Sequence, residues 1–125
     1  MTELKERNTE QEHLISIITE AIFEKKGIDV KLLDLRGITT IADFFLICSA
    51  ESDIQAKAIA DNIDKKLSEA GVKIWQKEGF KALSWILLDL SDIVVHIFRE
   101  EARQFYNLER LWGDAPVEEL ADTLK

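Results

Sequence analysis

Residues 84–115 read SWILLDLSDIVVHIFREEARQFYNLERLWGDA. Two runs of β-branched, aromatic and other apolar residues, at 85–88 and 93–98, have the composition of β-strands. Ser91 and Asp92 lie between them, and their short polar side chains favour a turn. The stretch therefore predicts a tight β-hairpin.

A helix is expected to follow the hairpin, from near Glu100 to near Gly113. Glu100 and Glu101 suit its start, because carboxylates are stabilised at the positive end of the helix dipole. The tail 116–125 has helix-compatible composition but little to pack against, and we assign it no role. Helical spacing predicts an inward face made of Ala102, Phe105, Leu108 and Leu111.

Upstream of the hairpin, helical and strand patterns alternate. Thr9 and Glu12 form a capping box that predicts a helix from Glu10, and Gly27 supplies its end. This helix is expected to bury Leu14, Ile18, Ala21 and Ile22. Further strands are predicted at 29–35, 44–49 and 72–78.

The run FFLICS at 44–49 is apolar throughout, which is typical of an interior strand covered on both faces. A second helix is expected after it, capped by Ser52 or Asp53 and closed by Gly71. Strand–helix–strand order predicts a crossover into a neighbouring strand. The inward face of this helix would consist of Ala56, Ile59, Ala60, Ile63, Leu67 and Ala70.

This order of elements predicts a single α/β domain over 1–125, with a mixed β-sheet flanked by helices and a core at about 9–114. Cys48 is the only cysteine and lies in an apolar run, so we expect a buried thiol in a reducing compartment. The first residues lack the apolar segment of a signal peptide, and no apolar run is long enough to span a bilayer. We therefore expect a cytoplasmic protein.

The charge balance favours a protein partner over nucleic acid. The net charge is −8, from 24 acidic and 16 basic side chains, and no basic cluster is larger than a pair. Nucleic-acid binders need basic patches that displace the counterions of phosphate. An acidic protein can instead dock on a basic protein component of a ribonucleoprotein.

The quoted stretch resembles the signature of the ribosomal silencing factor family, also called the iojap or RsfS-like family. The resemblance lies in the Trp85 strand, in Asp89 and Asp92 on either side of a turn, in VVHIF and in FYNLERLWGDA. IADFFLICSAESDIQAKAIAD at 41–61 carries it upstream. The family commonly has a threonine-glycine pair after the FFLIC-type strand and an arginine before the glutamine. Those places here hold Ser49-Ala50 and Ile54.

The resemblance implies an α/β fold related to the nucleotidyltransferase scaffold. It implies a translation repressor that binds the large ribosomal subunit through ribosomal protein fourteen and sterically blocks joining of the small subunit. No turnover, cofactor, metal or membrane contact belongs to this function. Whether the free protein is a homodimer stays open.

The alternative is a nucleotide-binding or nucleotidyltransferase-like enzyme on the same scaffold. Such enzymes need a Gly-Ser turn near phosphate and two aspartates, one residue apart on one strand face, that share magnesium. Asp89 and Asp92 are three residues apart with a predicted turn between them, so fixing that turn is the simpler interpretation. His96 has no cysteine or second histidine at ligand spacing, which disfavours zinc. We therefore assign no catalytic residue.

The aromatic residues indicate an interaction surface. Trp85 heads a strand near the sheet rim, and Tyr106 must turn about 100° away from Phe105 on a helix. Exposed Trp and Tyr beside carboxylates are typical of interface hot spots. We expect Arg99, Arg103 and Arg110 to order nearby acids through local pairs, and Phe98, Phe105 and Trp112 to pack in the core. The predicted partner-binding residues are Trp85, Tyr106, Glu78, Asp92, Glu101 and Glu109, supported by Asp89, His96, Phe105, Arg110 and Trp112.

Overall fold

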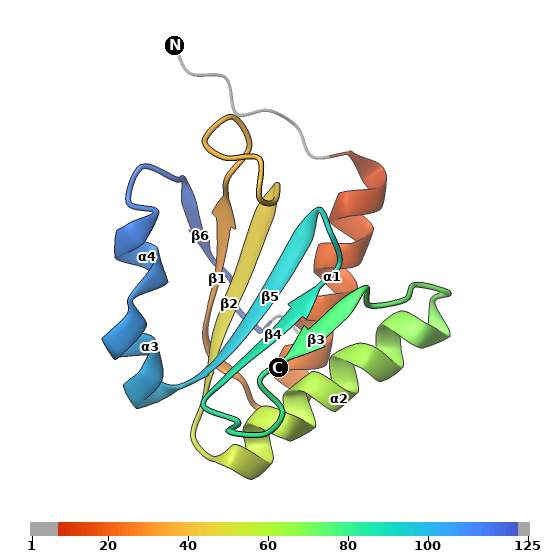
Figure 1. Ribbon diagram of the computed structural model, residues 1–125. Helices are drawn as coiled ribbons and strands as arrows, with labels where there is room; N and C mark the ends of the chain where they lie inside the picture. Colours follow the sequence, from red (N-terminus) through yellow and green to blue (C-terminus); the bar gives the residue numbers. More distant parts are fainter. Residues whose placement is uncertain (1–7, 123–125) are drawn as a thin grey trace.

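The computed structural model describes residues 8–122 and contains one six-stranded sheet with helices on both faces (Figure 1). The strand order is β3-β4-β5-β2-β1-β6; β2 and β5 are parallel and all other neighbours are antiparallel. The predicted α/β class and mixed sheet are confirmed. No helix in this part of the chain has the length and apolar character to cross a membrane. The elements are α1 (Thr9–Glu24), β1 (Ile28–Asp34), β2 (Phe44–Ala50), α2 (Asp53–Glu69), β3 (Gln76–Glu78), β4 (Trp85–Asp89), β5 (Ile93–Arg99), α3 (Glu100–Tyr106), α4 (Leu108–Leu111) and β6 (Val117–Glu119).

The centre of the sheet is the parallel pair β2–β5. The two strands pair along their whole length, from Phe44↔Ile93 to Ala50↔Arg99. Every residue of β2 is buried, as the apolar run predicts for a strand covered on both faces. The expectation that α2 leads directly into a neighbour of β2 is wrong, because the next strand, β3, lies at the sheet edge and β5 is reached through the β3–β4–β5 meander.

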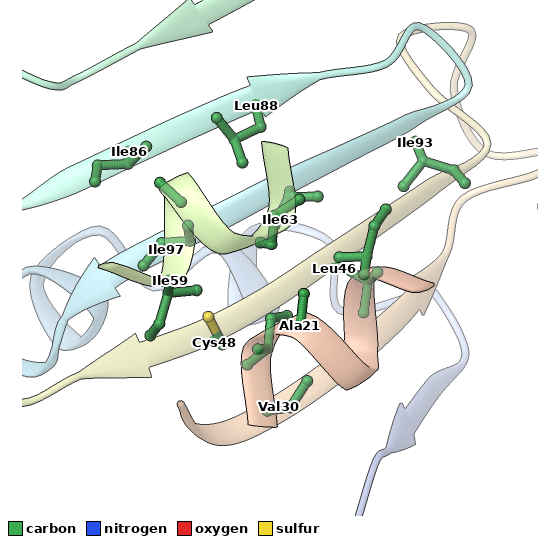
Figure 2. Packing of buried hydrophobic residues seen from close by; sticks show 14 of the residues in the cluster. Ala21, Val30, Leu46, Cys48, Ile59, Ile63, Ile86, Leu88, Ile93 and Ile97 are labelled. Carbon is green, nitrogen blue, oxygen red and sulfur yellow. The ribbon is translucent and has the colours of Figure 1, made fainter. Parts of the chain in front are cut away.

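Strand alternation divides the core between the two faces. One face packs on α1 and α2 and holds the larger cluster, part of which Figure 2 shows with Leu46, Cys48, Ile59 and Ile97. Burial raises the pKa of the Cys48 thiol to about 12, consistent with the expected buried hydrophobe. The opposite face packs on α3 and α4 through the smaller cluster, which comprises Leu33, Leu35, Ala42, Phe45, Ile47, Val94, Phe98, Leu108 and Ala115.

Caps and boundaries follow local chemistry, with two corrections. Ser52 caps α2 as expected, since its hydroxyl accepts a hydrogen bond from the Gln55 amide at 3.0 Å. The cap of α1 is Asn8 instead of Thr9, because the Asn8 side chain accepts from the Gln11 amide at 2.7 Å. The strand predicted at 72–78 is shorter, since only β3 finds a ladder partner, in β4.

The inward faces of α1 and α2 are largely as predicted. Ile18, Ala21 and Ile22 of α1 are fully buried, and Leu14 packs at the edge of the same cluster. Along α2 the predicted residues from Ala56 to Leu67 are buried. Ala70 is the exception: it is the exposed C-cap, beyond the last helical turn.

The predicted last helix is two short helices. Asn107 separates α3 from α4 with a left-handed backbone, φ 48° and ψ 59°, and its side chain accepts from the Arg110 amide at 3.3 Å. Asparagine tolerates this conformation through such local hydrogen bonds. The break changes the phase of the helical face, so Leu108 is buried whereas Phe105 and Leu111 are 82% and 71% exposed. The expectation that Phe105 and Leu111 point inward is therefore wrong.

The tail is also part of the sheet. Residues of β6 pair antiparallel with β1, from Lys31↔Glu119 to Leu33↔Val117. The backbone of β1 has an outer edge whose amides and carbonyls need partners, and β6 supplies them. The expectation that the tail 116–125 has little to pack against is therefore wrong for Val117–Glu119, while residues 123–125 lie outside the described residues.

The loop from β3 to β4 requires glycine at its first position. Gly79 has a left-handed backbone, φ +90°, and a Cβ atom there would lie 2.0 Å from the carbonyl oxygen of Trp85. Gly71 has a similar φ of +78° but nothing within 4 Å of such a Cβ. A side chain at Gly79 would therefore meet both backbone strain and a steric clash, whereas one at Gly71 would meet backbone strain alone.

We expect Gly79→Ala to lower the free energy of unfolding by about 3 kcal/mol, because strain and backbone clash combine. Gly71→Ala, the matched control, should cost only about 1 kcal/mol, since it meets strain alone. Urea unfolding of both variants measures the difference. Equal costs would show that the loop moves freely away from Trp85.

Candidate interaction surface

The helices α3 and α4 cover only part of their face of the sheet. The helix α3 packs mainly on β5 and β2 and touches β4 through Tyr106 and Trp85, while the rest of β4 and β3 extends beyond it (Figure 1). Pairing places Leu87 opposite both Glu78 and His96, and Asp89 opposite Gln76 and Val94, so these residues share the face of the smaller cluster. We call its uncovered part the open face. The open face consists of Gln76 and Glu78 of β3 with Trp85, Leu87 and Asp89 of β4.

Trp85 is the centre of an aromatic cluster at the edge of the open face. Its ring stacks on Phe98 with centroids 4.9 Å apart, and the Tyr106 ring of α3 lies 4.7 Å away. The indole Nε1–H donates a hydrogen bond to His96 Nδ1 at 3.1 Å. Trp85 lies one strand from the sheet rim, as expected, but it is half-buried and held from three sides.

His96 is a neutral acceptor inside this cluster. Because an indole N–H can only donate, His96 Nδ1 must carry a lone pair and the ring proton must be on Nε2. Burial lowers the pKa of His96 to about 4, so the neutral ring persists at neutral pH. The side chain is 3% exposed, packs edge-on against Phe45 at 4.5 Å, and its Nε2 has no hydrogen-bond partner among residues 8–122.

An exposed apolar patch continues from Tyr106 along α3 and α4. Tyr106 is 49% exposed and meets Phe105 edge-on at 5.1 Å; Phe105 and Leu111 line a shallow hollow with Asn107 and Arg110. Contiguous exposed apolar surface is a feature of interaction sites. The sequence interpretation placed Phe105 and Leu111 in the core, although Asn107 is of a type favoured at helix N-caps and could have located the break.

The other two aromatics expected in the core are there. Phe98 is fully buried, and Trp112 packs against the smaller cluster, edge-on to Phe45 at 6.0 Å. Arg110 is exposed.

The predicted acids do not form one group. Glu78 lies on the open face, and Glu101 lies at the start of α3, within 3.5 Å of Arg99. Asp92 precedes β5, whereas Trp85 pairs with Phe98 near the opposite end of that strand. At about 3.3 Å per residue this separates Asp92 from Trp85 by roughly 20 Å. The Asp92 carbonyl instead accepts from the amides of Asp43 and Phe44.

Asp89 fixes the hairpin turn, as expected. Its carboxylate accepts a hydrogen bond from the Ser91 amide at 2.7 Å, and Ser91 has a left-handed φ of 79°. The two aspartates therefore lie on either side of a turn. Within residues 8–122, no three His, Cys, Asp or Glu side chains are grouped closely enough to hold a metal ion.

Glu109 belongs to an ionic clamp beneath α3 and α4. Its carboxylate accepts from Arg103 Nη2 at 3.1 Å and lies 3.7 Å from the ammonium of Lys31. Arg103 is 5% exposed and also donates to the Asp29 carbonyl at 2.6 Å and the Ser49 hydroxyl at 2.9 Å. Burial opposes ionisation of Glu109, but the hydrogen bond and charge of Arg103 outweigh it and lower the pKa of Glu109. The expected pairing of Arg103 with an acid is confirmed.

Fold and surface together define a small α/β domain with an aromatic face that its helices leave uncovered. The family described as "Ribosomal silencing factor during starvation" matches residues 8–125. The chain is 45% identical over 109 residues to the ribosomal silencing factor of Halalkalibacterium halodurans, covering 87% of this chain and 93% of that protein. It is 44% identical over 110 residues to that of Bacillus subtilis, covering 88% and 93%. The chloroplastic protein Iojap of Zea mays is 38% identical over 110 residues, covering 85% of this chain and 46% of that protein.

Two solved structures share the fold. A crystal structure of a protein from Bacillus halodurans aligns with a TM-score of 0.77 at 40% identity, covering 87% of this chain and 99% of that one. One from Chromobacterium violaceum aligns with a TM-score of 0.79 at 32% identity, covering 91% and 95%. The chain belongs to the ribosomal silencing factor family.

We expect Arg103→Leu to destabilise the fold by about 3 kcal/mol at neutral pH. The substitution leaves the half-buried Glu109 carboxylate without its arginine, and the Asp29 carbonyl and Ser49 hydroxyl without their donor. The pKa of Glu109 in the folded protein lies below its ordinary value of 4.5, so the clamp stabilises above that pH and its contribution is lost on acidification through the lowered pKa. The difference between wild type and variant should therefore shrink in acid.

Urea unfolding between neutral and acidic pH measures this difference. Arg110→Leu, which removes an exposed arginine from the same segment, is the control and should change stability little. A cost for Arg103→Leu that does not depend on pH would contradict the assignment of Glu109 as its partner.

Proposed function

We propose that this chain represses translation by binding the large ribosomal subunit through ribosomal protein fourteen, so that the bound domain sterically blocks joining of the small subunit. Membership of the ribosomal silencing factor family supports the proposal, as do relatives that carry this name. The single structural observation in its favour is the aromatic cluster of Trp85 and Tyr106 at the edge of an uncovered sheet face.

This surface has the properties of a preformed docking site. Trp85 is fixed by stacking on Phe98 and by its hydrogen bond to His96, so little side-chain freedom is lost on binding. Tyr106 and Phe105 add exposed aromatic area next to it, and such residues dominate the energetics of interfaces.

The charge of the chain suits a basic protein partner. The net charge is −8, and the exposed carboxylates of Glu78 and Glu101 lie on β3 and at the start of α3. Acidic groups around an apolar patch speed encounter with a basic surface and disfavour direct contact with RNA phosphates. This supports ribosomal protein as the contacted component.

We propose that the protein acts in the cytoplasm by occupying its site on the large subunit, without catalysing a reaction. Repression then depends on the concentration of the protein relative to its dissociation constant for the subunit. The carboxylate that an enzyme on this scaffold would need, Asp89, is engaged with the Ser91 amide in the hairpin turn, which favours a structural role for it.

Sedimentation with purified subunits tests the proposal. The protein should pellet with large subunits and stay in the supernatant with small ones, and added protein should lower the yield of joined ribosomes. Equal recovery with small subunits would overturn the proposal. Light scattering of the free protein belongs in the same series, because a homodimer formed through the open face would compete with the subunit.

Truncation of the exposed aromatics should separate binding from folding. We expect Phe105→Ala and Tyr106→Ala each to weaken large-subunit binding by about 2 kcal/mol, as for interface hot spots. Urea midpoints should change little, because neither side chain is buried. Ile54→Ala is the control: Ile54 is 83% exposed on α2, which packs on the opposite face of the sheet. Unchanged binding in both aromatic variants would place the interface elsewhere.

Steering by acids predicts a salt dependence. Glu78→Gln should slow association with the large subunit severalfold at low salt. The difference from wild type should diminish as ionic strength rises, because the screening length shortens. Glu69→Gln removes an exposed carboxylate of α2 with the same change in net charge and should have little effect. Stopped-flow or surface-binding kinetics at several salt concentrations provide the measurement. Identical slowing in both variants would indicate that the net charge of the chain matters and the position of Glu78 does not.

A further inference from the structure

We propose that His96 is a positioning residue for the interaction surface: its Nδ1 holds the indole of Trp85 in the orientation that the partner contacts. The inference rests on the proposed function for its consequence in binding. That His96 sets the orientation of Trp85 is a statement about the free protein and does not depend on the proposed function.

The geometry places His96 where it can act only through Trp85. Trp85 pairs with Phe98 and Leu87 pairs with His96, so His96 is the diagonal neighbour of Trp85 across two antiparallel strands. The imidazole is 3% exposed, whereas the indole beside it reaches the open face. A partner that binds at the open face can therefore reach Trp85 but not His96, which lies behind the indole.

Stacking and hydrogen bonding constrain different features of the indole. Contacts with Phe98 at 4.9 Å and Tyr106 at 4.7 Å restrain the plane of the ring. They do not select which ring edge faces the sheet interior, because both edges can stack. The 3.1 Å bond from Nε1 to His96 Nδ1 selects the N–H edge for the interior.

Histidine at this position is not explained by packing. Its neighbours Phe45 and Phe98 are aromatic, and the Nε2–H that the acceptor role forces on the ring has no partner among residues 8–122. A buried donor without a partner lowers stability, and an apolar side chain of similar size would avoid that cost. The lowered pKa of His96 keeps the ring neutral, which the acceptor role requires.

Three substitutions test the inference. His96→Leu keeps an apolar side chain and removes the acceptor; His96→Asn places an amide oxygen where Nδ1 was; Trp85→Phe keeps an aromatic ring and removes the donor. The readouts are the indole N–H resonance of Trp85 and its hydrogen-exchange rate in the free protein, and binding to large subunits. Trp85→Phe also assigns the resonance among the three tryptophans.

We expect His96→Leu to shift the Trp85 indole resonance and speed its exchange, with a urea midpoint no lower than that of wild type. Binding should weaken by roughly tenfold, the factor for one lost buried hydrogen bond. His96→Asn should restore the slow exchange and most of the binding. In the Trp85→Phe background, His96→Leu should weaken binding no further, because its effect passes through the donor.

Other results would overturn the inference. Additive losses in the double variant would show that His96 acts independently of Trp85, and an unchanged indole resonance in His96→Leu would show that the bond does not set the orientation. A lower urea midpoint with normal binding per folded molecule would make His96 purely structural. Failure of wild type to bind large subunits would reject the proposed function, while the resonance and exchange data would still decide whether His96 positions Trp85.

Discussion

The parallel pairing of β2 with β5 is the contact on which the rest of the architecture depends. Both strands are buried along nearly their whole length, so each must be covered on both faces. The chain meets this requirement by sending α2 from the end of β2 to one face and α3 from the end of β5 to the other (Figure 1). The remaining four strands add in antiparallel fashion on the two flanks.

Unequal cover of the two faces follows from helix length. α1 and α2 are each about four turns long and cover the larger cluster, whereas α3 and α4 are short and divided at Asn107. They cover β5, β2 and β1 and reach β4 only at Trp85, which Tyr106 contacts, so the rest of β4 and β3 is open on that side. An aromatic surface consequently lies on a sheet whose strands are fixed by the opposite core, and a surface on rigid strands is held more accurately than one on loops.

Local pattern was sufficient to predict the hairpin, the buried run of β2 and the cap of α2, because each depends on neighbouring residues. The mixed sheet was predicted from the order of these elements. It failed at Asn107, since apolar spacing continues on both sides of the break and one left-handed residue changes the phase of everything after it. It failed at β6, because the pairing of Val117–Glu119 is dictated by the open edge of the distant β1. Of the candidate site, Trp85 and Tyr106 were predicted together, while the separation of Asp92 from Trp85 was already implied by the predicted hairpin, which places them at opposite ends of its first strand.

The polar groups of the interior are not all satisfied. Beneath α1 and α2, the buried amides are satisfied: Asn62 donates to the Ala21 carbonyl and to Glu24, and Gln11 donates to Asp43. Three buried side-chain atoms have no partner among residues 8–122. His96 Nε2 and Glu109 Oε1 belong to the face of the smaller cluster, whereas Arg99 Nε lies at the end of β5, where Arg99 pairs with Asp53 of α2. An unsatisfied buried atom lowers stability, so each one calls for an explanation in another contact of the same side chain. For Glu109 that contact is the clamp to Arg103, which stabilises the fold. For His96 it is the bond to Trp85, which we infer holds the indole in place at the cost of an unsatisfied Nε2–H.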